Sequence, residues 1–170
     1  IGNHGKQRCL RLDLLAELAV VVRTATKAYE DYDHARALEA TEQFFWTFCD
    51  DYLELVKERA YDQDGADAAG RDSAVATLQL ALNVLLRLLA PVIPFATEEV
   101  WRWTHEGSVH LAPWPTIEEI GVSDAPSGLL PAVSTALVGI RRAKTDAKVS
   151  QRTGVVSATI AGPAVLEGGV

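Results

Sequence analysis

The 170-residue sequence lacks methionine altogether and contains only two cysteines, Cys9 and Cys49. Two cysteines are too few for the disulfide scaffold of a small secreted domain. Without a secretion signal, we expect both to be free thiols. Cys49 stands in an aromatic helical pattern and is predicted to act as a small buried hydrophobic residue. The missing methionine, the initiating residue included, indicates a piece of a longer polypeptide.

Long hydrophobic runs and clustered metal ligands are also absent. The richest apolar stretch, Leu78–Leu89, is interrupted by Gln79, Asn83 and Arg87, so we expect no membrane-spanning segment. None of the four histidines has a cysteine or carboxylate at metal-ligand spacing. The aspartates of residues 62–67 lack the final glutamate of a calcium loop. We therefore expect no metal ion in this chain and, without any export signal, a cytoplasmic location.

No arrangement of side chains points to catalysis. Asp50, Asp51 and Glu54 are close in sequence. Helix polarity and an ion pair with Lys57 explain them better than an acid–base pair does. Hydrophobic residues make up 48% of the chain and charged residues 23%, which is typical of a globular protein with a buried core. The chain is thus predicted to bind a partner rather than to catalyse a reaction.

Basic residues are in the minority, with 16 Lys and Arg against 23 Asp and Glu and a net charge of −7. This total argues against nucleic-acid binding, which normally requires a basic surface. Residues 141–152, however, carry a local charge of +4, which leaves −11 on the remaining chain. The asymmetry favours a polyanionic partner for this segment. Its basic residues are Arg141, Arg142, Lys144, Lys148 and Arg152.

Helical periodicity runs through most of the chain. It predicts helices over residues 12–29, 33–61, 71–90, 94–106 and 129–148. Asp13 is expected to be the N-cap of the first helix, and Thr116 with Glu119 is expected to form a capping box. The β-branched residues within 155–160 predict a strand. The expected fold is an all-α antiparallel bundle of four to five helices with a short β-containing extension at the C-terminus. The expected core residues are Phe48, Tyr52, Leu82, Leu85, Leu89 and Val100.

Two features of these helices carry further expectations. Gln79, Asn83 and Arg87 recur every four residues on an apolar helix. Hydrogen bonds between bundle helices are the favoured interpretation, because buried polar groups need partners; contact with RNA is the alternative. The three aromatic residues 44–46 are consecutive and span a wide helical arc. At least one of them is therefore predicted to lie near the surface.

Three segments together resemble one known family. They are Phe44–Lys57 (FFWTFCDDYLELVK), Leu85–Trp101 (LLRLLAPVIPFATEEVW) and Gly107–Pro115 (GSVHLAPWP). In this order and spacing they resemble the helical anticodon-binding domain that valyl, isoleucyl, leucyl and methionyl class I synthetases share. The resemblance covers residues from about 12 to 148 and implies a tRNA-binding helical bundle.

Within that family the chain is most similar to the valyl group. Gly139–Lys148 (GIRRAKTDAK) resembles the helix that follows the bundle there. The isoleucyl group, which has a similar Val-His-Leu…Trp-Pro segment, is the alternative. The family's two ATP-binding signatures occur nowhere in the chain, and one of them requires methionine. The resemblance implies tRNA(Val) and a catalytic domain of the same polypeptide as partners, with neither membrane nor DNA. It implies no cofactor in this chain, and ATP with magnesium for the parent aminoacyl-tRNA synthetase.

The resemblance also divides the chain into three parts. Residues 1–11 are expected to be a leader or an artificial boundary, because they do not resemble the family's approach to its first helix. Residues 12–122 would form the anticodon-binding bundle. Residues 123–170 would comprise a linker, the basic helix and the truncated start of a small α/β extension.

Two kinds of side chain are expected to contact RNA. Single-stranded bases stack on aromatic rings, and phosphates pair with Lys and Arg. Arg141, Lys144, Lys148 and Arg152 step by three, four and four residues, which predicts one shared helical face. The dipole at a helix C-terminus would explain the last two without RNA, but not Arg141. A helical protein–protein interaction module is the rival hypothesis, and it has no special use for a basic face. The candidate RNA-binding residues are Phe45, Trp46, Lys57, Arg59, Arg141, Arg142, Lys144 and Lys148.

Overall fold

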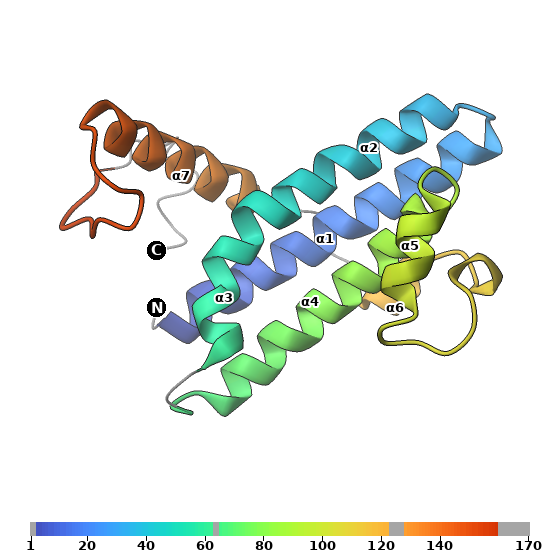
Figure 1. The fold of residues 1–170 in the computed structure, drawn as a ribbon, viewed down its shortest axis with the longest axis horizontal. Helices are drawn as coiled ribbons and strands as arrows, with labels where there is room; N and C mark the ends of the chain where they lie inside the picture. The colour runs from blue at the N-terminus through green and yellow to red at the C-terminus, as the bar shows by residue number, and fades with distance from the viewer. Residues whose placement is uncertain (1–2, 63–64, 123–127, 160–170) are drawn as a thin grey trace.

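The computed structural model describes residues 3–62, 65–122 and 128–159. Helices make up its regular structure (Figure 1), and no strand occurs within those ranges, which confirms the predicted all-α class. The elements in chain order are α1 (Asn3–Glu30), α2 (His34–Trp46), the π-helix η1 (Thr47–Tyr52), α3 (Leu53–Tyr61), α4 (Ala68–Leu89), α5 (Pro94–Trp101), the 3-10 helix η2 (Val109–Leu111), α6 (Ile117–Ile120) and α7 (Leu129–Asp146).

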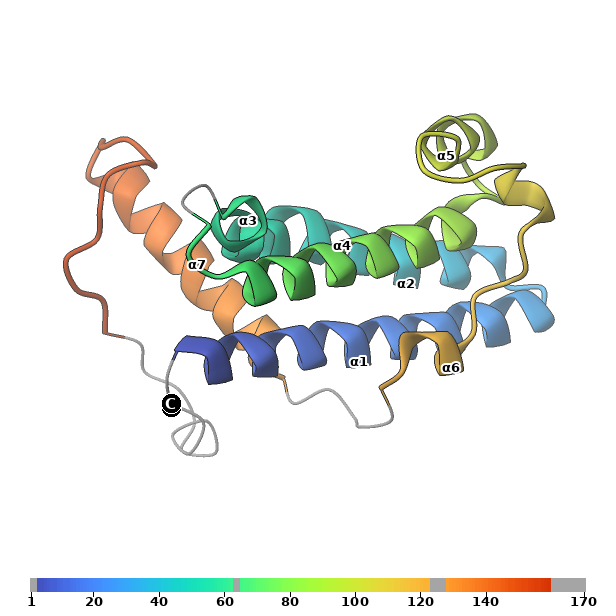
Figure 2. The ribbon, with the colours of Figure 1, turned by 90° about the horizontal axis from the view of Figure 1, so that it is seen from below.

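Three long rods form the body of the molecule. α1 packs against α2 and α4, and α3 follows α2 through η1 but turns away from the axis of α2 (Figures 1 and 2). α5 lies across one end of α4, and α6 lies along α1. α7 begins against α1 near the opposite end and slants away from the bundle (Figure 2). The basic helix is therefore attached to one end of the bundle rather than packed within it.

The first helix is longer than the sequence pattern predicts. α1 begins at Asn3, so Asp13 lies inside the helix and is only 3% exposed. The prediction of Asp13 as the N-cap of this helix is wrong, because the residues before it are helical too. Its carboxylate serves another helix: Oδ2 accepts a hydrogen bond from the backbone N–H of Leu130, at 2.7 Å, in the first turn of α7.

The predicted helix over residues 33–61 is divided by the π-helix η1 into α2 and α3, which point in different directions (Figures 1 and 2). Asp33 caps its start by accepting a hydrogen bond from the backbone N–H of Arg36 at 3.1 Å. The π-turn bonds each N–H to a carbonyl five residues back, so it rotates less per residue than an α-turn. Side chains spaced by four therefore stay in one row. Phe44, Phe48 and Tyr52 stack in this row, with ring centroids 6.5 and 6.2 Å apart.

The predicted core is confirmed in part. Phe48, Tyr52 and Leu85 are buried in the main hydrophobic cluster. Leu82 is 39% exposed, and Leu89 and Val100 are half-buried, so their prediction as core residues is wrong. Leu82 lines an open groove beside α4 instead of facing α1. An apolar pattern that nearly surrounds a helix does not show which side its neighbours will cover.

α4 is the one helix in the described ranges whose length and composition would allow it to cross a membrane. The expectation that no segment spans a membrane stays a prediction. α4 packs against α1, α2, α3 and α5, and the central helix of a bundle passes the same test. Its start is capped by Asp67, whose carboxylate accepts a hydrogen bond from the backbone N–H of Gly70 at 2.9 Å.

The C-terminal part differs from the sequence prediction at two points. α7 ends at Asp146, and Lys148 adopts a left-handed backbone conformation with φ of 54° that stops the helix. Residues 155–159 form no strand, so that prediction is wrong for them; residue 160 and the predicted linker at 123–127 lie outside the described residues. A strand needs a partner to satisfy its backbone groups, and none is present in the described part of the chain.

Candidate nucleic-acid interface

α7 is fastened to the bundle at two points. At its start, Leu130 is fully buried and its backbone N–H donates to the Asp13 carboxylate. Eleven residues later, the Arg141 guanidinium donates through Nη1 to Oδ1 of Asp51 at 3.3 Å. Its Nη2 donates to the backbone carbonyl of Asp50 at 2.9 Å. Both aspartates belong to the π-helix η1, so α7 and η1 together form this end of the molecule.

The other basic residues of this segment point in different directions. Arg142 is exposed, with Nε 4.0 Å from Oδ2 of Asp146. The Lys144 ammonium donates to the backbone carbonyl of Gln151 at 2.9 Å. Lys148 and Arg152 lie beyond the end of the helix and are exposed. The prediction of one helical face shared by four cations is therefore wrong, because the helix ends before two of them and Arg141 turns toward the bundle.

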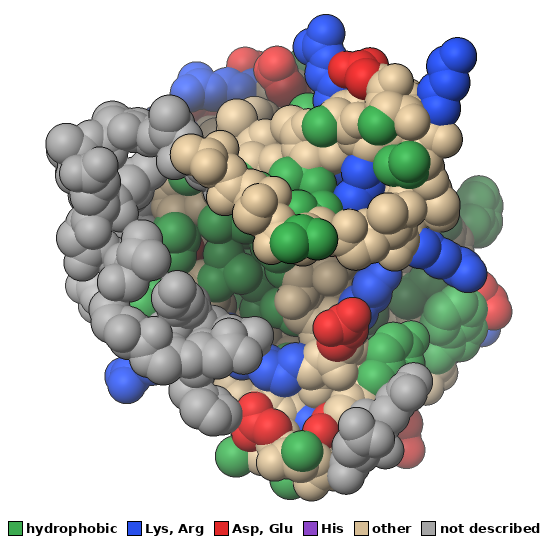
Figure 3. Space-filling model, turned by 90° about the vertical axis from the view of Figure 1, so that its left-hand side faces the viewer, with side chains coloured by type: hydrophobic (Ala, Val, Ile, Leu, Met, Phe, Trp, Pro, Cys, Tyr) green, Lys and Arg blue, Asp and Glu red, His purple; other side chains and the backbone are tan. Residues whose placement is uncertain are grey.

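Figure 3 looks directly at this end of the molecule. Lys and Arg side chains stand at several separate places around the face, with Asp and Glu between some of them. Hydrophobic side chains gather in a hollow near the middle. The surface therefore offers separated cations rather than one continuous basic patch. Such spacing suits contacts with individual phosphates along a nucleic-acid backbone.

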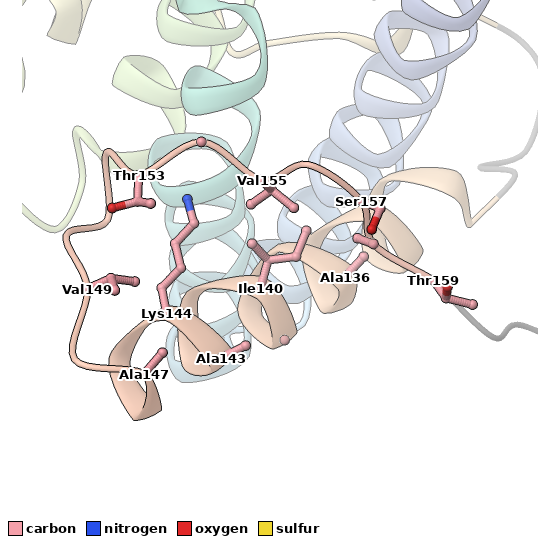
Figure 4. A pocket seen from close by; sticks show the side chains of 13 residues that line it. Ala136, Ile140, Ala143, Lys144, Ala147, Val149, Thr153, Val155, Ser157 and Thr159 are labelled. Atoms are coloured by element: carbon pink, nitrogen blue, oxygen red, sulfur yellow. The ribbon is translucent and has the colours of Figure 1, made fainter.

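The segment after α7 turns back along the helix. The Gln151 side-chain amide donates to the Arg141 carbonyl at 3.3 Å and to Oγ1 of Thr145 at 3.1 Å. Between this segment and α7 lies a groove of about 580 Å³, in which Ile140 and Val155 face each other (Figure 4). Its walls are mostly small apolar side chains, with Lys144 at the edge. The polar groups that line the groove are the Lys144 ammonium and the hydroxyls of Thr153, Ser157 and Thr159.

The aromatic residues 44–46 divide between core and surface. Phe44 is buried, Phe45 is half-buried against the core, and Trp46 is 53% exposed. This confirms that at least one of the three lies near the surface. The Phe45 and Trp46 rings meet edge to face with centroids 5.4 Å apart, and the indole Nε1 donates to Oε1 of Glu42 at 3.4 Å. The Trp46 side chain is therefore exposed to solvent, while its orientation is restrained by Phe45 and Glu42.

The two cations of α3 differ in their freedom. The Lys57 ammonium is exposed and lies 2.6 Å from Oε2 of Glu54, which confirms the predicted ion pair. Arg59 is half-buried, and no partner for its Nε occurs among the described residues. Lys57 can reach a ligand in solvent more readily than Arg59 can.

Asp13 and Glu17 are two acidic residues whose position beside the start of α7 was not predicted from the sequence. They stand one turn apart on α1, and Glu17 lines a groove with Gly128, Pro131 and Ser134 at the start of α7. Burial, and then the nearby charge of Asp13, raises the pKa of Glu17 to about 7. Two carboxylates on the otherwise apolar face that carries Leu14 and Leu18 were the available signal.

The polar residues of α4 hold the opposite end together. Arg87 is 6% exposed; its Nη2 donates to Oε2 of Glu119 at 2.9 Å and its Nη1 to the Pro113 carbonyl at 3.2 Å. Asn83 pairs with Nε2 of His105 at 2.8 Å. The favoured interpretation of hydrogen bonds between bundle helices is confirmed for Arg87, whose partner Glu119 lies in α6. Asn83 bonds instead to the non-helical segment after α5, and Gln79 is exposed. The capping box is also confirmed: Oε1 of Glu119 accepts from the Thr116 N–H at 2.8 Å.

Metal-binding chemistry finds no support in the described ranges. No group of three or more His, Cys, Asp or Glu residues there could hold a metal ion, and Asp64 lies outside these ranges. Cys9 is exposed, Cys49 is half-buried, and both are free thiols. Cys49 is therefore less buried than expected, although burial still raises its pKa. The end of the molecule formed by α7 and η1 therefore offers exposed cations and an exposed indole ring as groups that can contact a ligand.

Comparison with known proteins gives consistent results. Residues 12–160 match the family described as the anticodon-binding domain of tRNA ligase. The valine–tRNA ligase of Leifsonia xyli subsp. xyli is 60% identical over 153 residues, which cover 89% of this chain and 17% of that protein. That of Thermobifida fusca is 53% identical over 152 residues, covering 88% and 17%. That of Salinispora tropica is 50% identical over 167 residues, covering 89% and 19%. The chain thus spans less than a fifth of the length of these relatives, and the similarity favours the valyl over the isoleucyl alternative.

Proposed function

Since this chain belongs to the family of anticodon-binding domains of tRNA ligases, we propose that it recognises and orients tRNA(Val) for a valine–tRNA ligase. The observation that carries the proposal is the family match over residues 12–160, which includes both the bundle and the basic helix α7. The relatives named valine–tRNA ligase support the valyl assignment. In this role the chain supplies binding, and the chemistry takes place elsewhere in the polypeptide.

The parent enzyme would join valine to tRNA with ATP and magnesium, in a catalytic domain outside this chain. The absence of both ATP signatures from the 170 residues supports this division of labour. We further propose that the enzyme works in the cytoplasm. The bundle of residues 12–122 would bind the anticodon arm, and residues 123–170 would link it, through α7, to a further small domain.

We assign the RNA contacts to side chains of α7 and the residues after it, and to side chains of α2 and α3. Trp46 presents an open ring on which an unpaired base can stack, with Phe45 supporting it from behind. Lys57, Arg142 and Lys148 are exposed cations suited to phosphates. Arg59, Arg141 and Lys144 complete the proposed set, although each is partly engaged within the protein.

Direct binding tests this proposal. The affinity of the chain for tRNA(Val) transcript is measured by fluorescence anisotropy, beside a transcript of the same tRNA with a replaced anticodon. We expect tighter binding to the natural anticodon. Replacing Trp46 by Ala is expected to weaken binding by about five- to a hundredfold, which corresponds to about 1–3 kcal/mol for one stacked base. Equal affinity for both transcripts would contradict anticodon recognition, and no measurable affinity for either transcript would favour the interaction-module alternative.

A further inference from the structure

An acidic side chain of η1, Asp51, contacts α7 through Arg141 at 3.3 Å. We propose that Asp51 is a positioning residue for tRNA binding: it holds Arg141, and through Arg141 it aims the exposed cations of α7 and the residues after it toward the RNA. The inference rests on the proposed function. It deepens that function by assigning an RNA-binding role to an anionic residue that does not itself contact a phosphate.

The start of α7 acts as a fixed pivot. Leu130 is fully buried, and its backbone N–H donates to the buried Asp13 carboxylate at 2.7 Å. A negative charge at this position also suits the positive end of the helix dipole. One pivot fixes where the helix begins but leaves its direction free. A second contact farther along is needed to fix the angle.

Arg141 supplies that second contact. It lies eleven residues beyond Leu130, roughly 16 Å along the helix axis. Its guanidinium donates to the Asp51 carboxylate at 3.3 Å and to the Asp50 carbonyl at 2.9 Å. The Asp51 side chain is only 14% exposed, against 40% for Arg141. The contacts of α7 with the bundle are mainly those with α1 and η1, and its far end stands clear of the bundle (Figure 2). The Arg141–Asp51 pair is thus well placed to decide the angle.

This role predicts an effect opposite to simple electrostatics. An aspartate close to an RNA-binding surface repels phosphates, so its neutralisation should strengthen RNA binding if nothing else changes. If Asp51 holds α7 in place, its neutralisation should weaken binding, because Arg142 and Lys148 lose their fixed position. Asp50 offers a matched control, since it is the neighbouring acidic residue and contacts Arg141 only through its backbone carbonyl.

The experiment compares Asp51→Asn with Asp50→Asn, each in the 170-residue chain, by the Kd for tRNA(Val) transcript at fixed ionic strength. We expect Asp50→Asn to bind as tightly as the unsubstituted chain or more tightly. Asp51→Asn is expected to bind about two- to fivefold more weakly, in line with the strength of a partly exposed ion pair. The charge exchange Asp51→Arg with Arg141→Asp should restore part of the loss. Binding by Asp51→Asn that equals or exceeds that of Asp50→Asn would overturn the positioning role.

A second measurement reads the position of α7 without RNA. Spin labels at Glu39→Cys on α2 and Ala143→Cys on α7, both exposed positions, report an interhelix distance once Cys9→Ser and Cys49→Ala remove the native thiols. We expect a broader distance distribution in Asp51→Asn but not in Asp50→Asn. An unchanged distribution in Asp51→Asn would overturn the positioning role alone. Failure of the unsubstituted chain to bind tRNA would instead overturn the proposed function.

Discussion

Tyr52 carries a hydroxyl group into the core. The residue is fully buried, and burial raises the pKa of its phenol to about 12, against the opposing charges of Arg59 and Arg11. Thr77 is the nearest candidate partner and lowers this pKa through a hydrogen bond; its hydroxyl donates to the Ser73 carbonyl at 2.7 Å and can still accept from the phenol. No partner of good hydrogen-bond geometry for the Tyr52 hydroxyl occurs among the described residues. A buried polar atom of this kind costs free energy in the folded state.

Tyr52→Phe is therefore expected to keep or increase stability, by up to about 1 kcal/mol, because the substitution removes only a poorly paired hydroxyl. Chemical denaturation followed by circular dichroism measures the free energy of unfolding. Phe48→Leu, which alters the same aromatic row without touching a polar atom, is the control and should be destabilising. A loss of more than about 1 kcal/mol in Tyr52→Phe would show that the hydroxyl has a partner after all.

Leu85 is one of the residues of α4 at which truncation should be most costly. It is 1% exposed in the main cluster, so Leu85→Ala removes buried methyl groups and leaves a cavity. The expected loss is about 2–5 kcal/mol in the free energy of unfolding. The matched control is Leu82→Ala, three residues away and 39% exposed, which should cost clearly less. Equal losses at the two positions would mean that the groove beside Leu82 is covered in solution.

These two leucines also show what an apolar sequence pattern can and cannot predict. Both lie in the same apolar stripe, and the stripe correctly predicted a buried helix with Leu85 inside. It could not separate Leu85 from Leu82, because that difference depends on which neighbours pack against α4. The contacts of Asp13 and Asp51 were missed for the same reason. Their partners, Leu130 and Arg141, stand 117 and 90 residues away in sequence.

At the scale of elements, the junction of α1 and α7 should respond to pH. The pKa of Glu17 is raised to about 7 in the folded chain, from an ordinary value of 4.5, by burial and then by Asp13. The folded state therefore keeps a proton that the unfolded state releases between these values. By linkage, the contribution of protonated Glu17 to the free energy of unfolding is fully present below about pH 4.5. This contribution decreases as pH rises toward 7.

Glu17→Gln is expected to remove this decrease, because the amide stays neutral at every pH. The melting temperature of the variant should exceed that of the unsubstituted chain at pH 8, and the two should converge near pH 5. Thermal melts at pH 5, 6, 7 and 8 check this expectation. Glu39→Gln, at an exposed position on α2, should leave the pH profile unchanged. Parallel profiles for Glu17→Gln and the unsubstituted chain would place the Glu17 carboxylate in a better-solvated environment.

The boundaries of the helices were predicted from the sequence only in part. Periodicity predicted the rods, the proline-bounded start of α5 and the capping box, since all of these depend on residues a few positions apart. It did not predict the π-turn between α2 and α3, which inserts a wider turn without changing the apolar spacing. The strand predicted at residues 155–159 fails for lack of a partner. β-branched residues favour an extended backbone, but they do not supply a neighbouring strand with which to pair.

At the scale of the whole molecule, the charge asymmetry predicts a salt-dependent affinity. Each phosphate contact adds up to about 0.9 to the slope of log affinity against log salt on a duplex. Replacing Arg142, Lys144 and Lys148 together by Gln is expected to flatten this slope by up to about three units. Discrimination between anticodons should change little, because phosphate contacts position the RNA without reading it. Binding titrations at four salt concentrations measure the slope, and Arg23→Gln on the exposed side of α1 serves as a control. An unchanged slope would remove α7 from the RNA interface.

The hydrogen bond between Asp13 and Leu130 joins residues 117 positions apart in sequence, which has a consequence for the order of folding. A chain emerging from the ribosome folds its N-terminal part first. α1, α2 and α4 can associate while α7 is still inside the exit tunnel, at a stage when the bond between Asp13 and Leu130 cannot exist. That bond forms only after residue 130 has been made. The helix α7 thus completes the packing of α1, which is made well before it.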